Sequence, residues 1–320
     1  MQRRELIVGA LLGIGLGRSA LAQEWPERPI RVFVSGGPGS PADVAIRSLQ
    51  DVLARHLGQS IVVENRPGAH GLLGVDAAAK SVPDGYTLGI INFQTAVSPA
   101  MIAKMPFDLQ RDLIPVVQLT SESPVLLVRE ALGVKSLAAL IALAKKQPGQ
   151  LTYGSAGAGS PSNLGIELLQ RTVGIELRQV PYRTIAAAVV DLAGGTIDIA
   201  LAGSAAAQQG LKGGRMVALA ISAPQRKSTF PGLPTLAEAG FPIDLRGWNG
   251  IAAPTGTPAA VLAKLNKAVA LALADPVVMG RLEASGSEVS GVAGGAFQSF
   301  VQDEMQRWRK VVVDAKITAD

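Results

Sequence analysis

The sequence predicts an α/β protein built as two lobes. Three observations support this prediction. Short apolar, β-branched runs alternate with stretches that carry apolar residues at helical spacing, which is typical of sheets covered by helices. A strand, a glycine-rich loop and a helix follow one another twice, from Ile30 and again from Leu151. The chain of 320 residues is also long enough for two domains of ordinary size.

The strands are predicted where apolar runs are short and rich in β-branched residues. In chain order they cover Ile30–Val34, Ile61–Val63, Thr87–Ile91, Val125–Val128, Leu151–Tyr153, Leu177–Val180, Ile197–Leu201 and Val217–Ile221. Because helices alternate with these strands, we expect parallel sheets covered on both faces.

Helices are predicted where apolar residues recur every three or four positions. One such stretch, Ile46–Leu57, is expected to end at Gly58. A second, Leu164–Val173, precedes Gly174 in the same way. Three more follow towards the C-terminus, at Ala259–Ala274, Val277–Ala284 and Phe297–Val313. The last of them is strongly amphipathic.

The order of these elements predicts a discontinuous first lobe. We expect the chain to leave it near Leu119–Val128 and to return near Leu245–Pro254, where the strand-like segment GWNGIAAP precedes helices. The first lobe would then hold residues 23–123 and 246–320, and the second lobe residues 124–245. Two segments would cross between the lobes.

The first 22 residues have the layout of a secretory signal. A basic start (Arg3, Arg4) precedes an apolar run at Leu6–Leu16, and Ala20–Ala22 fits a cleavage site after Ala22. The apolar run is short for a membrane span. We therefore expect export to a periplasm, by the general secretory or the twin-arginine route.

The composition excludes several classes of function. The chain has no cysteine and only two histidines, which excludes thiolate chemistry and leaves no basis for a multi-histidine metal centre. Basic residues are scattered, the net charge is +5 and aromatic residues make up 4%, which argues against nucleic-acid binding. Nucleotide-binding and hydrolase motifs are missing as well. We expect no catalysis, no metal and no cofactor.

The two glycine-rich loops, Ser35–Asp43 and Gly154–Ser162, are the candidate binding elements. Their small residues let a ligand approach the backbone, and a helix N-terminus offers unpaired N–H groups with a partial positive charge. Two such loops facing each other would bind an anion from both sides. The alternative is that they only cap helices, with Asp43 and either Ser162 or Asn163 as the N-cap residues.

The chain resembles the Bug (TctC-like) family, the periplasmic substrate-binding proteins of tripartite tricarboxylate transporters. The resemblance covers essentially the whole chain after the signal. It rests on WPERPIRVFVS at Trp25–Ser35, VVENRPGAHGLLG at Val62–Gly74, PDGYTLGI at Pro83–Ile90, MPFDLQRDLIPV at Met105–Val116, YGSAGAGS at Tyr153–Ser160, VPYR at Val180–Arg183, GGTIDIALAG at Gly194–Gly203, LPTLAEAGFP at Leu233–Pro242 and GWNGIAAPTGTP at Gly247–Pro258.

The resemblance implies a type II periplasmic-binding-protein fold, with a ligand cleft between two lobes. It also implies a monomeric receptor that binds a small organic anion, a carboxylate or dicarboxylate, and delivers it to the membrane permease subunits of a tripartite tricarboxylate-type transporter. Carried over by position, the ligand-binding residues are Gly36, Gly37, Pro38, Gly39, Ser40, Asp43, Asn92, Gln94, Thr95, Ser155, Ala156, Gly157, Gly159, Ser160, Arg183, Gly203 and Ser204.

The chain departs from the family pattern at several of these positions. Gly36 stands where the family commonly has Phe, and Ser40 where it has a second Gly. Arg183 replaces a more usual Lys, and Asn163 holds a position often occupied by His. We expect these changes to reshape the pocket floor. A guanidinium at position 183 could bind a carboxylate through two parallel hydrogen bonds.

Some polar residues are assigned structural roles. We expect Asp43 to brace its helix and loop, Arg47 to pair with a carboxylate or carbonyl, and Asp198 to be structural. Tyr182 fits either stacking on a ligand or lobe packing, and Trp248 is expected to pack at the return crossing.

Three alternative functions remain open at this point. An amino-acid receptor could use Asp43 or Asp198 to bind an ammonium group. A periplasmic sensor would use the same ligand chemistry but would signal to a kinase. An exported small-ester hydrolase is disfavoured because neither His56 nor His70 lies in a plausible setting for a general base.

Overall fold

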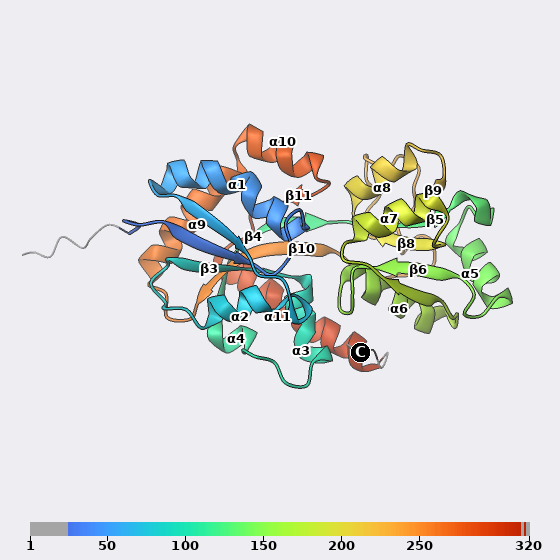
Figure 1. The fold of residues 1–320 in the computed structure, drawn as a ribbon, viewed down its shortest axis with the longest axis horizontal. Coiled ribbons are helices and arrows are strands. Elements are labelled where there is room, and N and C mark those ends of the chain that lie inside the picture. Colours follow the sequence, from blue (N-terminus) through green and yellow to red (C-terminus); the bar gives the residue numbers. More distant parts are fainter. Residues whose placement is uncertain (1–24, 315–316, 318–320) are drawn as a thin grey trace, which may run out of the picture.

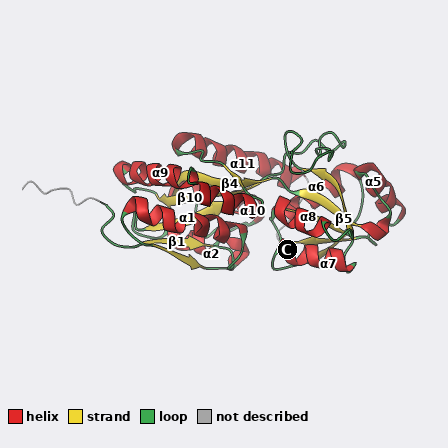
Figure 2. Ribbon diagram, turned by 90° about the horizontal axis from the view of Figure 1, so that it is seen from above, coloured by secondary structure: helices red, strands yellow, loops and turns green. Residues whose placement is uncertain are grey.

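The computed structural model describes residues 25–314 and residue 317. The predicted signal, residues 1–22, lies outside the described residues. Two sheets lie side by side with helices on both faces of each (Figures 1 and 2). None of the described helices is long and apolar enough to cross a membrane.

The first sheet has six strands in the order β11-β4-β10-β3-β1-β2. β1 pairs in parallel with β2 and β3, whereas β10 runs antiparallel to both β3 and β4. The strands are β1 Ile30–Val34, β2 Ile61–Asn65, β3 Thr87–Asn92, β4 Leu113–Glu122, β10 Gly247–Pro254 and β11 Glu288–Val289.

The second sheet has five strands in the order β7-β6-β8-β5-β9. β6 pairs in parallel with β7 and β8, whereas β5 is antiparallel to β8 and β9. The strands are β5 Val125–Arg129, β6 Thr152–Ser155, β7 Arg178–Pro181, β8 Ile199–Ala202 and β9 Met216–Ile221. The unit β2-β1-β3 of the first sheet thus has a counterpart in β7-β6-β8.

The expectation of parallel sheets is wrong for the strands at the crossings. β5 and β10 each enter a sheet from the other lobe, so they run against the strands that end at the lobe boundary. The sequence-based exit near Leu119–Val128 also missed that a ten-residue strand, β4, leads to the crossing. Only Ser123 and Pro124 separate β4 from β5.

Helices cover the first sheet in two groups. α1, α9 and α10 pack on one face and α2, α3 and α11 on the other, as Figure 1 shows. Their bounds are α1 Pro41–Leu57, α2 Leu73–Ala79, α3 Phe93–Met101, α4 Leu109–Asp112, α9 Ala259–Leu273, α10 Pro276–Ala284 and α11 Gly294–Asp314. The predicted apolar face of α11 is confirmed, since Phe297, Val301, Trp308 and Val312 are buried.

The second sheet is covered in the same way. α7 and α8 share one apolar core with β5 and β8, and α5 and α6 pack on the opposite face. The bounds are α5 Leu137–Lys146, α6 Pro161–Val173, α7 Ile185–Gly194 and α8 Ser204–Leu211, with single 3-10 turns at Ala69–Gly71 and Glu130–Leu132. The predicted helix ends are confirmed, because Gly58 and Gly174 are left-handed C-caps.

Trp248 packs at the return crossing, as predicted. Its side chain is 2% exposed and meets the rings of Phe297 and Phe300 edge-on, with centroids 5.8 and 5.5 Å away. Its Nε1 donates a hydrogen bond to Glu304 Oε2 (3.3 Å). One continuous apolar cluster extends from this region into both sheets, so the crossing is well packed on the side of α11.

Candidate functional site

The glycine-rich loops end at serines that cap α1 and α6. Ser40 Oγ accepts a hydrogen bond from Asp43 N (3.4 Å), and Ser160 Oγ accepts one from Asn163 N (3.2 Å). A proline at the first position of each helix starts it without needing an N–H group. The predicted N-caps, Asp43 and Ser162 or Asn163, are therefore wrong, because both helices begin earlier and these residues lie inside the first turn.

A second contact gives the two loops the same backbone arrangement. Asp43 Oδ2 accepts a hydrogen bond from Gly39 N (2.9 Å), and Asn163 Oδ1 accepts one from Gly159 N (3.1 Å). Gly39 and Gly159 have φ values of +79° and +76°, which glycine adopts at little cost. The loops are thus equivalent, although the residue that braces them is charged in one and neutral in the other.

Asp43 is the centre of a polar cluster below the first loop. Its Oδ1 accepts hydrogen bonds from Arg47 Nε (2.7 Å) and Asn65 Nδ2 (2.9 Å), and Asn65 Nδ2 also donates to Gly36 O (3.0 Å). Burial alone would raise the pKa of Asp43, but hydrogen bonds from Gly39, Asn65 and Arg47 outweigh it and lower the pKa. The structural roles predicted for Asp43 and Arg47 are confirmed.

The second loop rests on a hydrogen-bonded network that sequence reasoning missed. Asn163 Nδ2 donates to Tyr153 Oη (3.3 Å), and Tyr153 Oη donates to Glu167 Oε1 (2.6 Å). Gln179 Nε2 donates to Ser155 Oγ (2.6 Å). These residues come from β6, α6 and β7. They form no motif in the sequence, because only the folded sheet brings them together.

The serine side chains of the loops have partners within the protein. Ser155 and Ser160 are buried, and Ser160 Oγ donates to a carbonyl of its own loop (2.7 Å). Backbone donors remain available instead. The N–H groups of Gly36, Gly37 and Ala158 form no hydrogen bond with any residue that the structure describes. Such unpaired N–H groups in small-residue loops are suited to binding anions.

Two further helices begin beside the loops, at the ends of β3 and β8. Asn92 caps α3 in a capping box with Thr95, whose side chain is fully buried. Gly203 is the N-cap of α8. Ser204, the first residue of α8, donates a hydrogen bond from its Oγ to Ser123 O (2.9 Å). The side chains of Asn92, Thr95 and Ser204 thus stabilise helix starts. Their helices add two positive dipole ends to those of α1 and α6.

Gln94 connects the two lobes. Its Nε2 donates a hydrogen bond to Ala158 O of the second loop (2.9 Å). A Cβ built on Gly159 would lie 3.7 Å from Gln94 Cγ and 3.2 Å from Met101 Sδ. Both ends of α3 therefore lie against the second loop, and elements of both lobes contribute to one site.

We expect Gln94→Ala to weaken ligand binding about fivefold, because it removes one hydrogen bond that holds the lobes together, and one such bond contributes about 1 kcal/mol. Calorimetric titration measures the change. The stability of the free protein should be almost unchanged. Gln302→Ala, which truncates an exposed glutamine on α11, is the matched control and should bind like the wild type. Equal affinities for the two variants would contradict the prediction.

The remaining polar candidates lie elsewhere or are exposed. Arg183 is exposed, and it forms no ion pair or hydrogen bond with a described residue. Asp198 precedes β8, at the end opposite to Gly203, and accepts hydrogen bonds from Arg129 Nε (2.5 Å) and Thr152 N (2.7 Å). Its predicted structural role is confirmed. Tyr182 Oη donates to a carboxylate of α7 (2.7 Å), in agreement with lobe packing.

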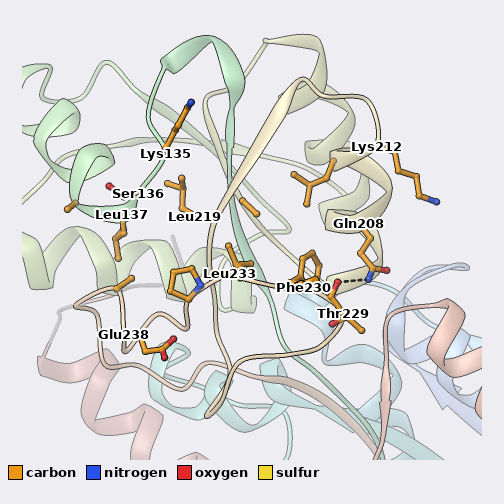
Figure 3. A pocket seen from close by; sticks show the side chains of 17 residues that line it. Lys135, Ser136, Leu137, Gln208, Lys212, Leu219, Thr229, Phe230, Leu233 and Glu238 are labelled. Carbon is orange, nitrogen blue, oxygen red and sulfur yellow. Dashed lines mark hydrogen bonds between the residues drawn. The ribbon is translucent and has the colours of Figure 1, made fainter.

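A groove of about 1060 Å³ lies on the second lobe, away from the loops (Figure 3). Leu137, Leu219, Phe230 and Leu233 form apolar parts of its lining. The described residues contain no group of three or more His, Cys, Asp or Glu that could hold a metal. The groove shares no residue with the glycine-rich loops, which carry the unpaired backbone N–H groups. We therefore place the candidate site at the loops and not at the groove.

Comparisons with known proteins agree on one family. The family model described as tripartite tricarboxylate transporter family receptor (TctC) matches residues 45–317. Protein BugT of Bordetella pertussis is 34% identical over 316 residues, 98% of this chain and 97% of BugT. Members of the family include periplasmic binding proteins, and the structural relatives are solute-binding receptors, not enzymes.

Two solved structures carry ligands in their titles. Rpa4515 of R. palustris with adipate is 32% identical, with a TM-score of 0.82 and coverage of 92% of this chain and 99% of that one. MatC of Rhodopseudomonas palustris with bound malate is 32% identical, with a TM-score of 0.81 and coverage of 90% and 100%. The type II periplasmic-binding-protein fold is confirmed, and the chain belongs to the Bug/TctC family of periplasmic solute-binding receptors.

Proposed function

We propose that this receptor binds a small dicarboxylate in a cleft between its lobes. The observation that carries the proposal is the pair of similarly braced loops before α1 and α6, which leave the N–H groups of Gly36, Gly37 and Ala158 unpaired among the described residues, with Gln94 linking the lobes. Two helix N-termini per lobe can balance about one negative charge per lobe. The adipate and malate in the solved relatives support a diacid.

The proposed ligand contacts come mainly from backbone groups. The glycine-rich loops would supply N–H groups to the two carboxylates, with bridging waters at modest cost. Arg183 is exposed and unpaired among the described residues, so it could reach a carboxylate at the mouth of the cleft. The side chains of Asn92, Thr95 and Ser204 would act by fixing helix starts. Specificity would then depend on the shape of the closed cleft.

We also propose the lobe boundaries that the sequence predicts. Residues 23–123 and 246–320 would form one lobe, because they supply every strand of the six-stranded sheet. Residues 124–245 would form the other, since they supply the five-stranded sheet. Export after cleavage at Ala22 would place the receptor in the periplasm as a monomer. There it would deliver its ligand to permease subunits of a tripartite tricarboxylate-type transporter.

The contacts of two aspartates favour a diacid over an amino acid. The carboxylate of Asp43 is occupied by Gly39, Arg47 and Asn65. Asp198 lies at the opposite end of β8 from the loops. Neither is therefore free to bind a ligand ammonium group, the role considered for them from the sequence.

A thermal-shift panel on the unliganded mature protein tests the proposed function. We expect a dicarboxylate at 100 times its dissociation constant to add about 2.7 kcal/mol, which raises Tm by several degrees. Monocarboxylates, amino acids, sugars and phosphate should give smaller shifts. A shift with sugars or phosphate alone would contradict the proposal. Calorimetry on the strongest diacid then gives affinity and stoichiometry.

A further inference from the structure

Glu122 ends β4 at the first crossing between the lobes and has contacts in both. It lies opposite Gly247, the first residue of the second crossing strand. Its Oε2 would lie 3.1 Å from a Cβ built on Gly203, the N-cap of α8. A Cβ built on Gly247 would lie 3.6 Å from Glu122 Cβ and 3.9 Å from Pro161 Cγ, at the start of α6. The carboxyl group is therefore beside two helix starts of the candidate site.

No basic side chain forms an ion pair with Glu122 in the part of the chain that the structure describes. The nearby charged residues have other partners. Glu288 on β11 pairs with Lys227 (2.9 Å), and Arg246, just before β10, pairs with Asp244 (2.9 Å). The ends of β5 and β8 at the crossing and the first turns of α6 and α8 contain no charged residue. No basic side chain would therefore balance a charge on Glu122, and the helix starts beside it are the ones that the proposed ligand also uses.

Glu122 is half-buried, and desolvation in this setting raises its pKa to about 7, whereas the hydroxyl of Ser287 lowers it. Ser287 belongs to the loop before β11, in the first lobe. Contact with the second lobe comes from Gly203. Because Gly203 of the second lobe lies against the carboxyl group, separation of the lobes would expose the group further, and its pKa would fall towards the ordinary value of 4.5.

We propose that Glu122 makes closure of the cleft depend on pH: its neutral acid form allows the lobes to close over an anionic ligand, and its carboxylate form opposes closure. The inference rests on the proposed function, since it requires an anion between the lobes. Closure would remove water from a negative charge that no basic side chain balances, which is costly. The same charge would repel the anion bound near the starts of α6 and α8. Ligand binding should therefore be accompanied by proton uptake.

The pH dependence of ligand affinity follows from the difference in proton binding between the closed and the open form. Between pH 4.5 and 7 the closed form holds a proton on Glu122 that the open form lacks, so a lower pH favours closure. The wild type should bind a diacid about tenfold more tightly at pH 6 than at pH 8. Above pH 8 the affinity should no longer change with pH through this group.

Calorimetric titration with malate and adipate at pH 6, 7 and 8 tests the inference. Both diacids remain mostly doubly ionised over this range. Two buffers with different ionisation enthalpies report proton uptake directly. We expect uptake in the wild type at pH 6 to 7, and none in Glu122→Gln, whose amide is neutral at every pH. Glu122→Gln should therefore bind with a similar affinity at all three pH values.

Glu283→Gln is the matched control, because Glu283 is exposed on α10 and forms no ion pair among the described residues. It should keep the wild-type pH response. Other titratable groups contribute equally to the pH response of all three proteins. The difference between the wild type and Glu122→Gln is therefore the quantity to measure.

Two results would overturn the inference while leaving the proposed function intact. One is diacid binding by the wild type without proton uptake, a measurement that holds even if Glu122→Gln fails to fold. The other is an equal pH response in the wild type and Glu122→Gln. Failure of every protein to bind either diacid at any pH would contradict the proposed function, and this inference with it.

Discussion

Replacing Asp43 with alanine is expected to destabilise the protein by about 3 kcal/mol and to weaken diacid binding by more than tenfold. The side chain of Asp43 is 5% exposed and accepts hydrogen bonds from Gly39 N, Arg47 Nε and Asn65 Nδ2. Its loss leaves these donors without their acceptor. Arg47 is 43% exposed, so water compensates part of that loss. The loop N–H groups would then no longer be held in place for the ligand.

Asp43→Asn is the informative conservative variant, because Asn163 fills the equivalent position of the second loop. The amide oxygen can still accept from Gly39 N, but the ion pair with Arg47 is lost. We expect a destabilisation of about 1 kcal/mol and a small loss of affinity. Urea unfolding and calorimetry measure both quantities. If Asp43→Ala bound diacids as tightly as the wild type, the loop would not need this brace.

The pH dependence of stability provides a separate check on Asp43. Its pKa in the folded protein is lowered below the ordinary value of 3.8. Its contribution to stability is therefore complete above pH 3.8 and is lost as the pH falls through the lowered pKa. In Asp43→Asn this part of the acid dependence should be missing. Comparing the unfolding free energies of the two proteins below pH 4 isolates it.

Local patterns predicted much of the fold because they are properties of single elements. The strand Ile30–Val34 and the returning strand Gly247–Pro254 are observed at the predicted bounds. Gly58 and Gly174 end their helices because a left-handed residue terminates the hydrogen-bond ladder. β4 was missed because Pro115 and several polar residues interrupt its apolar run. Its burial comes from pairing with β10, which no local pattern reveals.

The site was predicted at the level of loops, but not of contacts. Glycines at a strand–helix junction mark a close approach of ligand or backbone, which the sequence displays directly. The braces of those loops are non-local. Asn65 is 22 residues from Asp43, and Glu167 is 14 from Tyr153. The sequence does not mark Glu122 as a candidate either. Its surroundings form only in the folded protein, where the two crossing strands and the end of β8 meet.

Positions 36 and 40, where this chain departs from the family pattern, lie so close together that side chains at both would overlap. A Cβ built on Gly36 would lie 2.8 Å from Ser40 Cβ, and closer still to the hydroxyl that caps α1. Ser40 thus fills the volume in which a side chain at position 36 would begin. A chain with Phe at 36 and Gly at 40 would avoid this overlap. The two substitutions are therefore expected to compensate each other.

Gly36→Ala is expected to destabilise the protein by about 2 kcal/mol, because the added Cβ overlaps Ser40 and displaces its hydroxyl from Asp43 N. In a Ser40→Gly background the same change should cost less than about 0.5 kcal/mol, so a double-mutant cycle should give a coupling near 1.5 kcal/mol. Urea unfolding of the four proteins measures it.

Ala156→Gly is the matched control in the second loop, because Ala156 precedes the capping serine Ser160 at the same spacing as Gly36 precedes Ser40. Removing this Cβ relieves no overlap, so we expect a change of less than about 1 kcal/mol. Additive effects of Gly36→Ala and Ser40→Gly would show that the first loop can open as far as the second. Coupling confined to the first loop would instead mean that Gly36 and Ser40 act as one unit, which gives the two loops different shapes.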